Sequence, residues 1–116
     1  MESKIDLLND VNVIIFRISG RLLKEEDVQF LEETIQAKLM LPFNKVLIDL
    51  TELNYVNSSG INLFMKIMNK SRILGGDIAF FGVHGDVKKL FDIAKLSEIY
   101  TVFASEEEGK EYFKNN

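Results

Sequence analysis

The strongest constraint on the fold is a nearly continuous apolar run at residues 45–50, which is soon followed by a helical pattern. Only Asp49 interrupts the run, and such a strand is typical of a sheet that is covered on both faces. The helical pattern begins near Ser59, and Gly75 and Gly76 end it. A buried strand that leads into a long amphipathic helix favours an α/β fold.

Strand and helix signals alternate along the rest of the chain. Two runs rich in Ile and Val, residues 4–8 and 11–19, flank the turn formers Asn9 and Asp10, which predicts an opening hairpin. Further strands are expected at residues 78–82 and 100–104, and helices at residues 24–39, 86–96 and from Ser105 onward. Strands joined through helices pair in parallel by right-handed crossovers. The sequence therefore predicts one α/β domain, residues 1–116, with a small mixed β-sheet packed by about four helices.

Composition excludes several classes of protein. The chain has 116 residues, a hydrophobic content of 47% and a net charge of −4, and its lysines are scattered. A nucleic-acid binder normally carries a basic patch, so nucleic acid is not an expected partner. The absence of cysteine excludes disulfides and thiolate metal sites. No apolar run has the length of a signal peptide or a membrane span, so we expect a cytoplasmic protein.

The sequence offers little for catalysis or metal binding. His84 is the only histidine, and an isolated histidine near a strand-to-helix loop is more often a surface or capping residue than a catalyst. The acids at residues 25–27 and 106–108 fall in the first turns of predicted helices, where the helix dipole explains them better than a metal does. We interpret Phe64, Met65 and Met68 as core residues. We expect no enzymatic activity, no metal and no cofactor.

The segment Asn57-Ser58-Ser59-Gly60 lies just before the predicted long helix. The first N–H groups of a helix are unpaired and the helix dipole is positive there, so a phosphate at this point would be stabilised. A phosphoserine would bring a charge of about −1.5 to −2 and change the local surface. Ser and Asn are also common N-caps for reasons of stability alone. The local pattern therefore leaves both roles open.

Four segments have a recognisable order: Gly20-Arg21-Leu22, Leu47-Ile48-Asp49-Leu50-Thr51, Val56-Asn57-Ser58-Ser59-Gly60, and Gly75-Gly76 before a strand. Together with the order of the elements, they resemble the STAS domain, in particular the stand-alone anti-sigma-factor antagonists of bacteria. The resemblance covers nearly the whole chain and implies a STAS-like fold.

The resemblance also implies a function, that of a non-enzymatic phospho-switch protein in transcription regulation. In that family, the unphosphorylated antagonist binds an anti-sigma factor that is also a serine kinase, phosphorylation breaks the complex, and a phosphatase resets it. Ser58 matches the phosphoacceptor, and the N–H groups of Ser59 and Gly60 are expected to hold the phosphate. The implied partner-binding residues are Asn57, Ser59, Gly60, Gly20, Arg21 and Leu22. We expect a monomer or weak dimer.

Two positions depart from the family pattern. Asn57 stands where the family usually has Asp, and Leu23 stands where many members have Asp. Both differences remove a carboxylate from the surface expected to face the kinase. The alternative function is a STAS scaffold or regulatory subunit, such as a transport-system component, that binds a protein without phosphorylation. Both positions are expected in exposed loops, where substitutions usually change stability by no more than about 0.5 kcal/mol.

Overall fold

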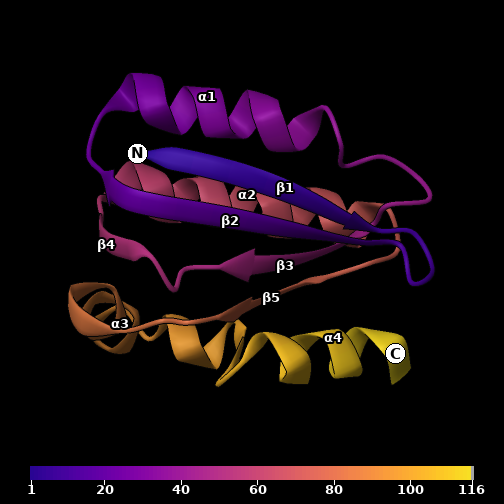
Figure 1. Ribbon diagram of the computed structural model, residues 1–116. Helices are drawn as coiled ribbons and strands as arrows, with labels where there is room; N and C mark the ends of the chain where they lie inside the picture. The colour runs from indigo at the N-terminus through magenta and orange to yellow at the C-terminus, as the bar shows by residue number, and fades with distance from the viewer. Residues whose placement is uncertain (116) are drawn as a thin grey trace.

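The computed structural model describes residues 1–115, which form a sheet with helices on both of its faces (Figure 1). The strands are β1 (Glu2–Leu8), β2 (Val13–Leu22), β3 (Lys45–Asp49), β4 (Leu53–Val56), β5 (Ile78–Phe81) and β6 (Thr101–Phe103). The helices are α1 (Glu25–Gln36), α2 (Ser58–Ile73), α3 (Gly85–Ile93), the short 3-10 helix η1 (Leu96–Glu98) and α4 (Glu106–Asn115). Within residues 1–115, no helix is both long and apolar enough to cross a membrane.

The sheet is mixed, with strand order β1-β2-β3-β5-β6. β1 and β2 form the expected antiparallel hairpin, and β3, β5 and β6 follow in parallel. β4 lies off this path and pairs in parallel with the end of β2, after a shift of register between Gly20 and Arg21. The predicted α/β fold class, with an opening hairpin followed by parallel crossovers, is confirmed.

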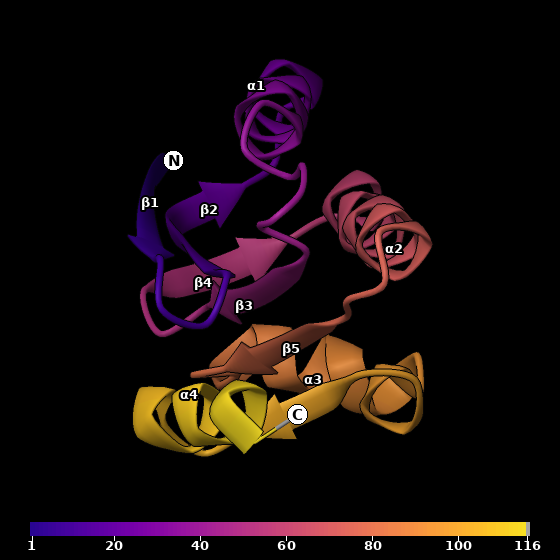
Figure 2. The same cartoon turned by 90° about the vertical axis from the view of Figure 1, so that its right-hand side faces the viewer.

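The two faces of the sheet carry separate apolar clusters. α1 and α2 lie on one side and α4 on the other (Figure 2). Side chains alternate along β3, so that Ile48 belongs to the large cluster with α1, α2 and α3, whereas Leu47 belongs to the smaller cluster with Phe113 of α4. In the large cluster, Phe80 contacts three aromatic rings, Phe64, Phe91 and Tyr100, at centroid distances of 5.2, 5.4 and 4.8 Å.

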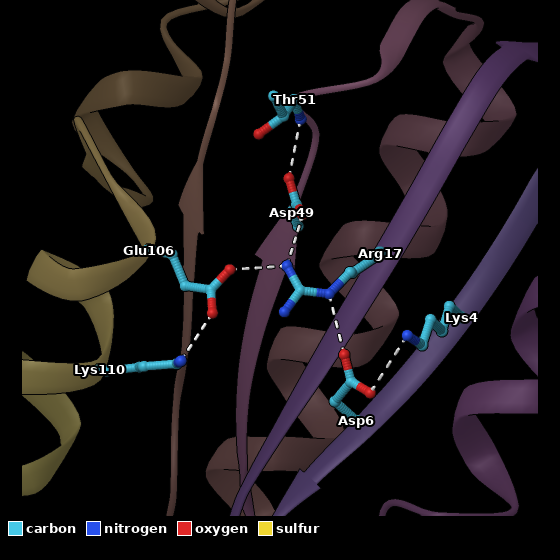
Figure 3. A network of polar contacts seen from close by, with 7 residues as sticks. All are labelled: Lys4, Asp6, Arg17, Asp49, Thr51, Glu106 and Lys110. Atoms are coloured by element: carbon cyan, nitrogen blue, oxygen red, sulfur yellow. Dashed lines mark hydrogen bonds and ion pairs between the residues drawn. The ribbon is translucent and has the colours of Figure 1, made fainter.

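A polar network joins α4 to three strands (Figure 3). Arg17 of β2 donates through Nε to Asp6 of β1 at 2.9 Å, and through Nη1 to Asp49 of β3 at 2.8 Å and Glu106 of α4 at 2.7 Å. Lys110 adds an ion pair to Glu106 at 2.6 Å. The hydrogen bond from Arg17 lowers the pKa of Glu106 to about 2, and the same bond raises the pKa of Arg17. Charge pairing therefore fixes the start of α4 on the sheet.

The structure corrects several expectations about elements. Residues 53–56, where the sequence predicts no strand, form β4, whose two central side chains are exposed and give no apolar signal. α1 ends at Gln36, before the predicted end at Leu39. Met65 was expected in the core, but it is 38% exposed because the buried face of α2 passes through Phe64, Ile67, Met68 and Ser71.

Candidate functional site

The N-termini of α1 and α2 lie side by side at the end of the sheet where β2 and β4 finish (Figure 1). β4 leads directly into Asn57, whose backbone is extended and whose Oδ1 accepts the Gly60 N–H at 2.9 Å. The Asn57 N–H donates to the carbonyl of Leu22 at 3.1 Å, which ties the cap to the end of β2. Asn57 is therefore the N-cap of α2, and the predicted strand-to-helix junction is confirmed.

The side-chain amide of Asn57 has a second bond on its other side. Its Nδ2 donates to the carbonyl of Leu23 at 2.9 Å, so the residue joins the loop between β2 and α1 to the start of α2. The two backbone partners, one donor and one acceptor, determine which way the amide points. An ionised aspartate at this position accepts hydrogen bonds only, so it could not donate to Leu23.

The two serines differ in their environment. Ser58 is the first residue of α2, is exposed, and its hydroxyl has no hydrogen-bond partner among residues 1–115. The Ser59 hydroxyl donates to the carboxylate of Glu25, the first residue of α1. Ser58 faces a hollow of about 330 Å³ beside α3, whereas Ser59 faces a groove of about 440 Å³ between α1 and α2. The two hydroxyls thus open toward different sides of the helix.

Gly60 has a packing role. A Cβ at this position would lie 2.4 Å from Cγ2 of Val56 and 2.9 Å from Cδ2 of Leu22, so a larger residue forces its neighbours to move. Its N–H already donates to Asn57, which does not leave it free for a phosphate. In the described part of the chain, the N–H groups that lack an acceptor here are those of Ser58 and Ser59.

Each residue of the segment Gly20-Arg21-Leu22 has a different role at this end of the sheet. Gly20 has a φ of +89° and donates its N–H to the carbonyl of Glu52 at 2.9 Å, where β2 shifts register against β4. The exposed Arg21 guanidinium lies 5.5 Å from the centroid of the Tyr55 ring. Leu22 is fully buried, so its side chain lies in the core beneath this surface and not on it. Its inward direction follows from strand alternation beside Arg21.

The lining of the hollow beside Ser58 was not predicted from the sequence. Leu90 of α3 and Ala94, the C-cap residue of that helix, line the hollow that Ser58 faces, together with Tyr55 and Ile61. The helical spacing of Leu90 and Ala94 indicates their shared face, but only the fold brings α3 beside β4. Leu23 is 48% exposed, which confirms that it lies in an exposed loop.

His84, the remaining polar candidate, makes a structural contact. His84 Nε2 is 2.7 Å from the carbonyl of Thr51, so the imidazole links the start of α3 to the turn after β3. Within the part of the chain that the structure describes, no group of three or more His, Asp or Glu side chains could hold a metal ion.

Comparison with known proteins decides the family. The STAS domain model matches residues 4–109. The chain belongs to the STAS domain family. No match is found among curated proteins.

Solved structures show the same fold. The anti-sigma factor antagonist SpoIIAA in its unphosphorylated form is 17% identical, with a TM-score of 0.85 over 99% of this chain and 98% of that one. The phosphorylated form of SpoIIAA, a Bacillus cell fate determinant, is 17% identical, with a TM-score of 0.75 over 96% and 98%. The murine anion transporter Slc26a9 is 18% identical, with a TM-score of 0.74 over 90% of this STAS chain and 18% of the transporter. At these identities the likeness establishes a common fold.

Proposed function

We propose that this STAS protein is an anti-sigma-factor antagonist and a non-enzymatic phospho-switch. Unphosphorylated, it binds an anti-sigma factor that is also a serine kinase, in the bacterial cytoplasm. Phosphorylation of Ser58 releases the partner, and a phosphatase restores the free hydroxyl. The observation that carries the proposal is the exposed, unbonded hydroxyl of Ser58 at the first position of α2, among residues 1–115 of a SpoIIAA-like fold.

The contrast between the two serines supports Ser58 as the acceptor. The Ser59 hydroxyl is bonded to Glu25, so phosphorylation there would break that bond and place a dianion against a carboxylate. Ser58 has neither obstacle. A phosphate on Ser58 lies close to the unpaired N–H groups of Ser58 and Ser59 and to the positive end of the α2 dipole. Phosphorylation at this position therefore adds charge without disturbing the cap.

The surface around Ser58 supports partner docking. Asn57 holds the exposed Leu23 loop next to the acceptor helix, and Arg21 lies nearby on Tyr55. Gly20 and Gly60 permit the backbone geometry that places these side chains, and Leu22 supports them from below. A docked partner and a phosphate on Ser58 would occupy the same surface, which explains how modification releases the partner.

A scaffold role is the second candidate function. The anion transporter Slc26a9 contains this fold within a much longer chain, so the fold also occurs as one part of a transport protein. The two functions differ in whether a charge on Ser58 changes partner binding.

The test is phosphorylation by a serine kinase of the anti-sigma-factor type that binds this protein. We expect one phosphate on Ser58, located by mass spectrometry of tryptic peptides, lost in Ser58→Ala and kept in the matched control Ser59→Ala. Binding to the same kinase should weaken in Ser58→Asp and persist in Ser58→Ala. A phosphate found on Ser59 contradicts the assignment, and equal binding by Ser58→Asp and Ser58→Ala favours the scaffold.

A further inference from the structure

The strand β1 forms one edge of the sheet, and its outer side is open. It stands at one end of the strand order and, among the described strands, pairs with β2 alone. In Figure 2, α1 and α2 lie to the right of β1 and α4 lies below it, so no described helix covers its outer side. Every second residue of β1 directs its backbone N–H and C=O groups away from β2. This row of groups can therefore pair with a further strand.

The features that usually block such an edge are shortness, proline, a bulge or charge. β1 has seven residues, whereas β6 at the opposite edge has three. Its pairing with β2 runs without a shift of register from Glu2 to Leu8, and the single proline of the chain is Pro42. Charge is the feature that β1 does have, so the positions of its charged residues decide what can pair with it.

The charged residues of β1 are Glu2, Lys4 and Asp6, at every second position. They therefore point to the same face of the sheet. The Lys4 side chain is 73% exposed, and its Nζ lies 3.9 Å from Oδ1 of Asp6, which is a long ion pair. Arg17 donates to the other oxygen of Asp6, Oδ2, at 2.9 Å. Lys4 and Oδ1 of Asp6 can thus both bind a group on a neighbouring strand.

A second copy of β1 can pair with the first in only a few antiparallel registers. Opposite residues must both direct their backbone groups toward the partner strand or both away from it, so each register is centred on one residue. A centre at Lys4 or at Asp6 places that residue opposite its own copy, which brings like charges together. A centre at Ile5 places Lys4 opposite Asp6 of the second copy, and this pair occurs twice.

The length of the strand favours the same register. Ile5 is the middle residue of β1, so a centre there pairs all seven residues, whereas a centre nearer either end leaves part of the strand without a partner. Directly opposite side chains have Cβ atoms about 4.5–5.5 Å apart, and diagonal neighbours lie about 7–8 Å apart. The two direct pairs of Lys4 with Asp6 therefore contribute more than the diagonal contacts between like charges.

From the open edge and this charge pattern, we propose that β1 pairs with β1 of a second copy of this chain, antiparallel and centred on Ile5. The two sheets become one continuous sheet across a two-fold axis. On the face opposite the charges, Leu7, which is 38% exposed in the single chain, lies against Ser3 of the second copy. The interface is closed at two copies and only one strand wide, so the dimer is weak.

The proposal goes beyond the proposed function and does not depend on it. Asn57, Ser58 and Ser59 lie at the start of α2 and not in β1. A charge on Ser58 is therefore not expected to change dimerisation, and Ser58→Asp should dimerise like the wild type.

Single cysteines test the register, because the chain contains no cysteine of its own. In Ile5→Cys the two new thiols lie directly opposite, with Cα atoms about 4.5–5.5 Å apart, and a disulfide should form under mild oxidation of the full chain. Ser3→Cys and Leu7→Cys are matched controls on the same face. Each lies about 13 Å from its own copy and should stay uncrosslinked alone, whereas a mixture of the two variants should give the mixed disulfide. Non-reducing gel electrophoresis separates these products.

Sedimentation velocity of the full chain, from micromolar to millimolar concentration, measures the dimer itself. Lys4→Glu replaces both pairs with Asp6 by like charges and should weaken dimerisation by about tenfold. The control Lys38→Glu makes the same change of charge at an exposed position just after α1 and should leave the dissociation constant within about twofold. Added salt should weaken the wild-type dimer.

Three results would overturn the proposal. They are a chain that stays monomeric over this range, cross-linking of Ser3→Cys or Leu7→Cys alone as fast as that of Ile5→Cys, and equal effects of Lys4→Glu and Lys38→Glu. If Ile5→Cys fails to fold, the mixture of the other two cysteine variants tests the same register. A kinase that leaves Ser58 unmodified would count against the phospho-switch and leave the dimer in place, and a monomeric chain phosphorylated on Ser58 would do the reverse.

Discussion

Asn57 is the residue on which the geometry of the site depends most. Its carbonyl oxygen caps α2 through Gly60, and its amino group holds the Leu23 carbonyl. One side chain thus couples the start of α2 to a loop residue 34 positions earlier in the chain. The sequence suggested only the capping half of this role, because the Leu23 partner is brought close by the pairing of β2 with β4.

Asn57→Asp should destabilise the fold by about 1 kcal/mol at neutral pH. The carboxylate still caps Gly60 and gains from the helix dipole, but it faces the Leu23 carbonyl without a proton to donate. This differs from the sequence-based expectation of no more than about 0.5 kcal/mol. Urea unfolding at pH 7 and pH 3 measures the change in the free energy of unfolding. The loss of stability should be smaller at pH 3, where the protonated carboxyl group can donate to the Leu23 carbonyl. A variant as stable as the wild type at pH 7 would show that the Leu23 bond contributes nothing.

The Leu23 position supplies the matched control for that measurement. Leu23 is 48% exposed, so Leu23→Asp adds a carboxylate to the same loop without removing a described side-chain hydrogen bond. It should change the free energy of unfolding by less than about 0.5 kcal/mol.

At the scale of single residues, the sequence predicted where the site lies better than what each side chain does. The strand-to-helix junction at Asn57 and Ser58 follows from local pattern. The bond between Ser59 and Glu25 joins residues 34 apart, and the burial of Leu22 depends on β4 pairing, so neither has a local signal.

Among the α-helices of residues 1–115, α4 has the fewest buried side chains, and charged residues make up more than half of its sequence. Gly109 and Phe113 are its buried residues, and Gly109 allows close approach, because a Cβ there would lie 2.6 Å from Cδ1 of Leu47. The Ser105 hydroxyl oxygen accepts the Glu108 N–H at 3.3 Å and so caps the start of α4. The attachment of α4 therefore relies strongly on the bond between Arg17 and Glu106.

Glu106→Gln should lower stability by about 1 kcal/mol at pH 7, since it removes a charge-assisted bond that is only partly buried. The folded-state pKa of Glu106, about 2, lies below its ordinary value of 4.5. The contribution of its charge is therefore complete above about pH 4.5 and is lost as the pH falls through about 2. Urea titrations between pH 7 and pH 2 should show the two curves converging in acid. Glu107→Gln, at an exposed position of the same turn, is the control.

The helices and strands could be predicted from the sequence where they have a clear apolar pattern. Both strands of the hairpin, β3, β5 and all four α-helices were expected close to their observed places. β4 was missed because a strand of four residues with two exposed central side chains has no periodic signal. It forms because the end of β2 offers it backbone partners.

For the whole molecule, the two apolar clusters are unequal in extent. The large one joins α1, α2 and α3 to the sheet, and the smaller one joins only α4 and the opposite face. The strands β2, β3 and β5 contribute to both clusters, so the sheet is common to the two layers. Loss of contacts in the large cluster should consequently destabilise more of the molecule than loss of contacts in the smaller cluster.

Phe80→Ala should cost about 3–5 kcal/mol and reduce protection throughout the sheet, because Phe80 contacts three other rings in the large cluster. Phe113→Ala should act mainly on α4. Amide hydrogen exchange measures both, and in Phe113→Ala the α4 amides should exchange faster while those of α2 and β3 stay protected. Uniform loss of protection in Phe113→Ala would show instead that the two layers unfold as one unit.

The Arg17 network also has a consequence for the order of folding. Its guanidinium meets Asp6, 11 positions away, Asp49, 32 positions away, and Glu106, 89 positions away. Closing the longest of these loops loses the most chain entropy, so the hairpin contact is expected early and the α4 contact late. A bond that forms after the rate-limiting step governs how fast the native state opens and leaves the speed of its formation almost unchanged. The bond of Glu106 to Arg17 then slows unfolding. It lengthens the lifetime of the folded protein and has little effect on the folding rate.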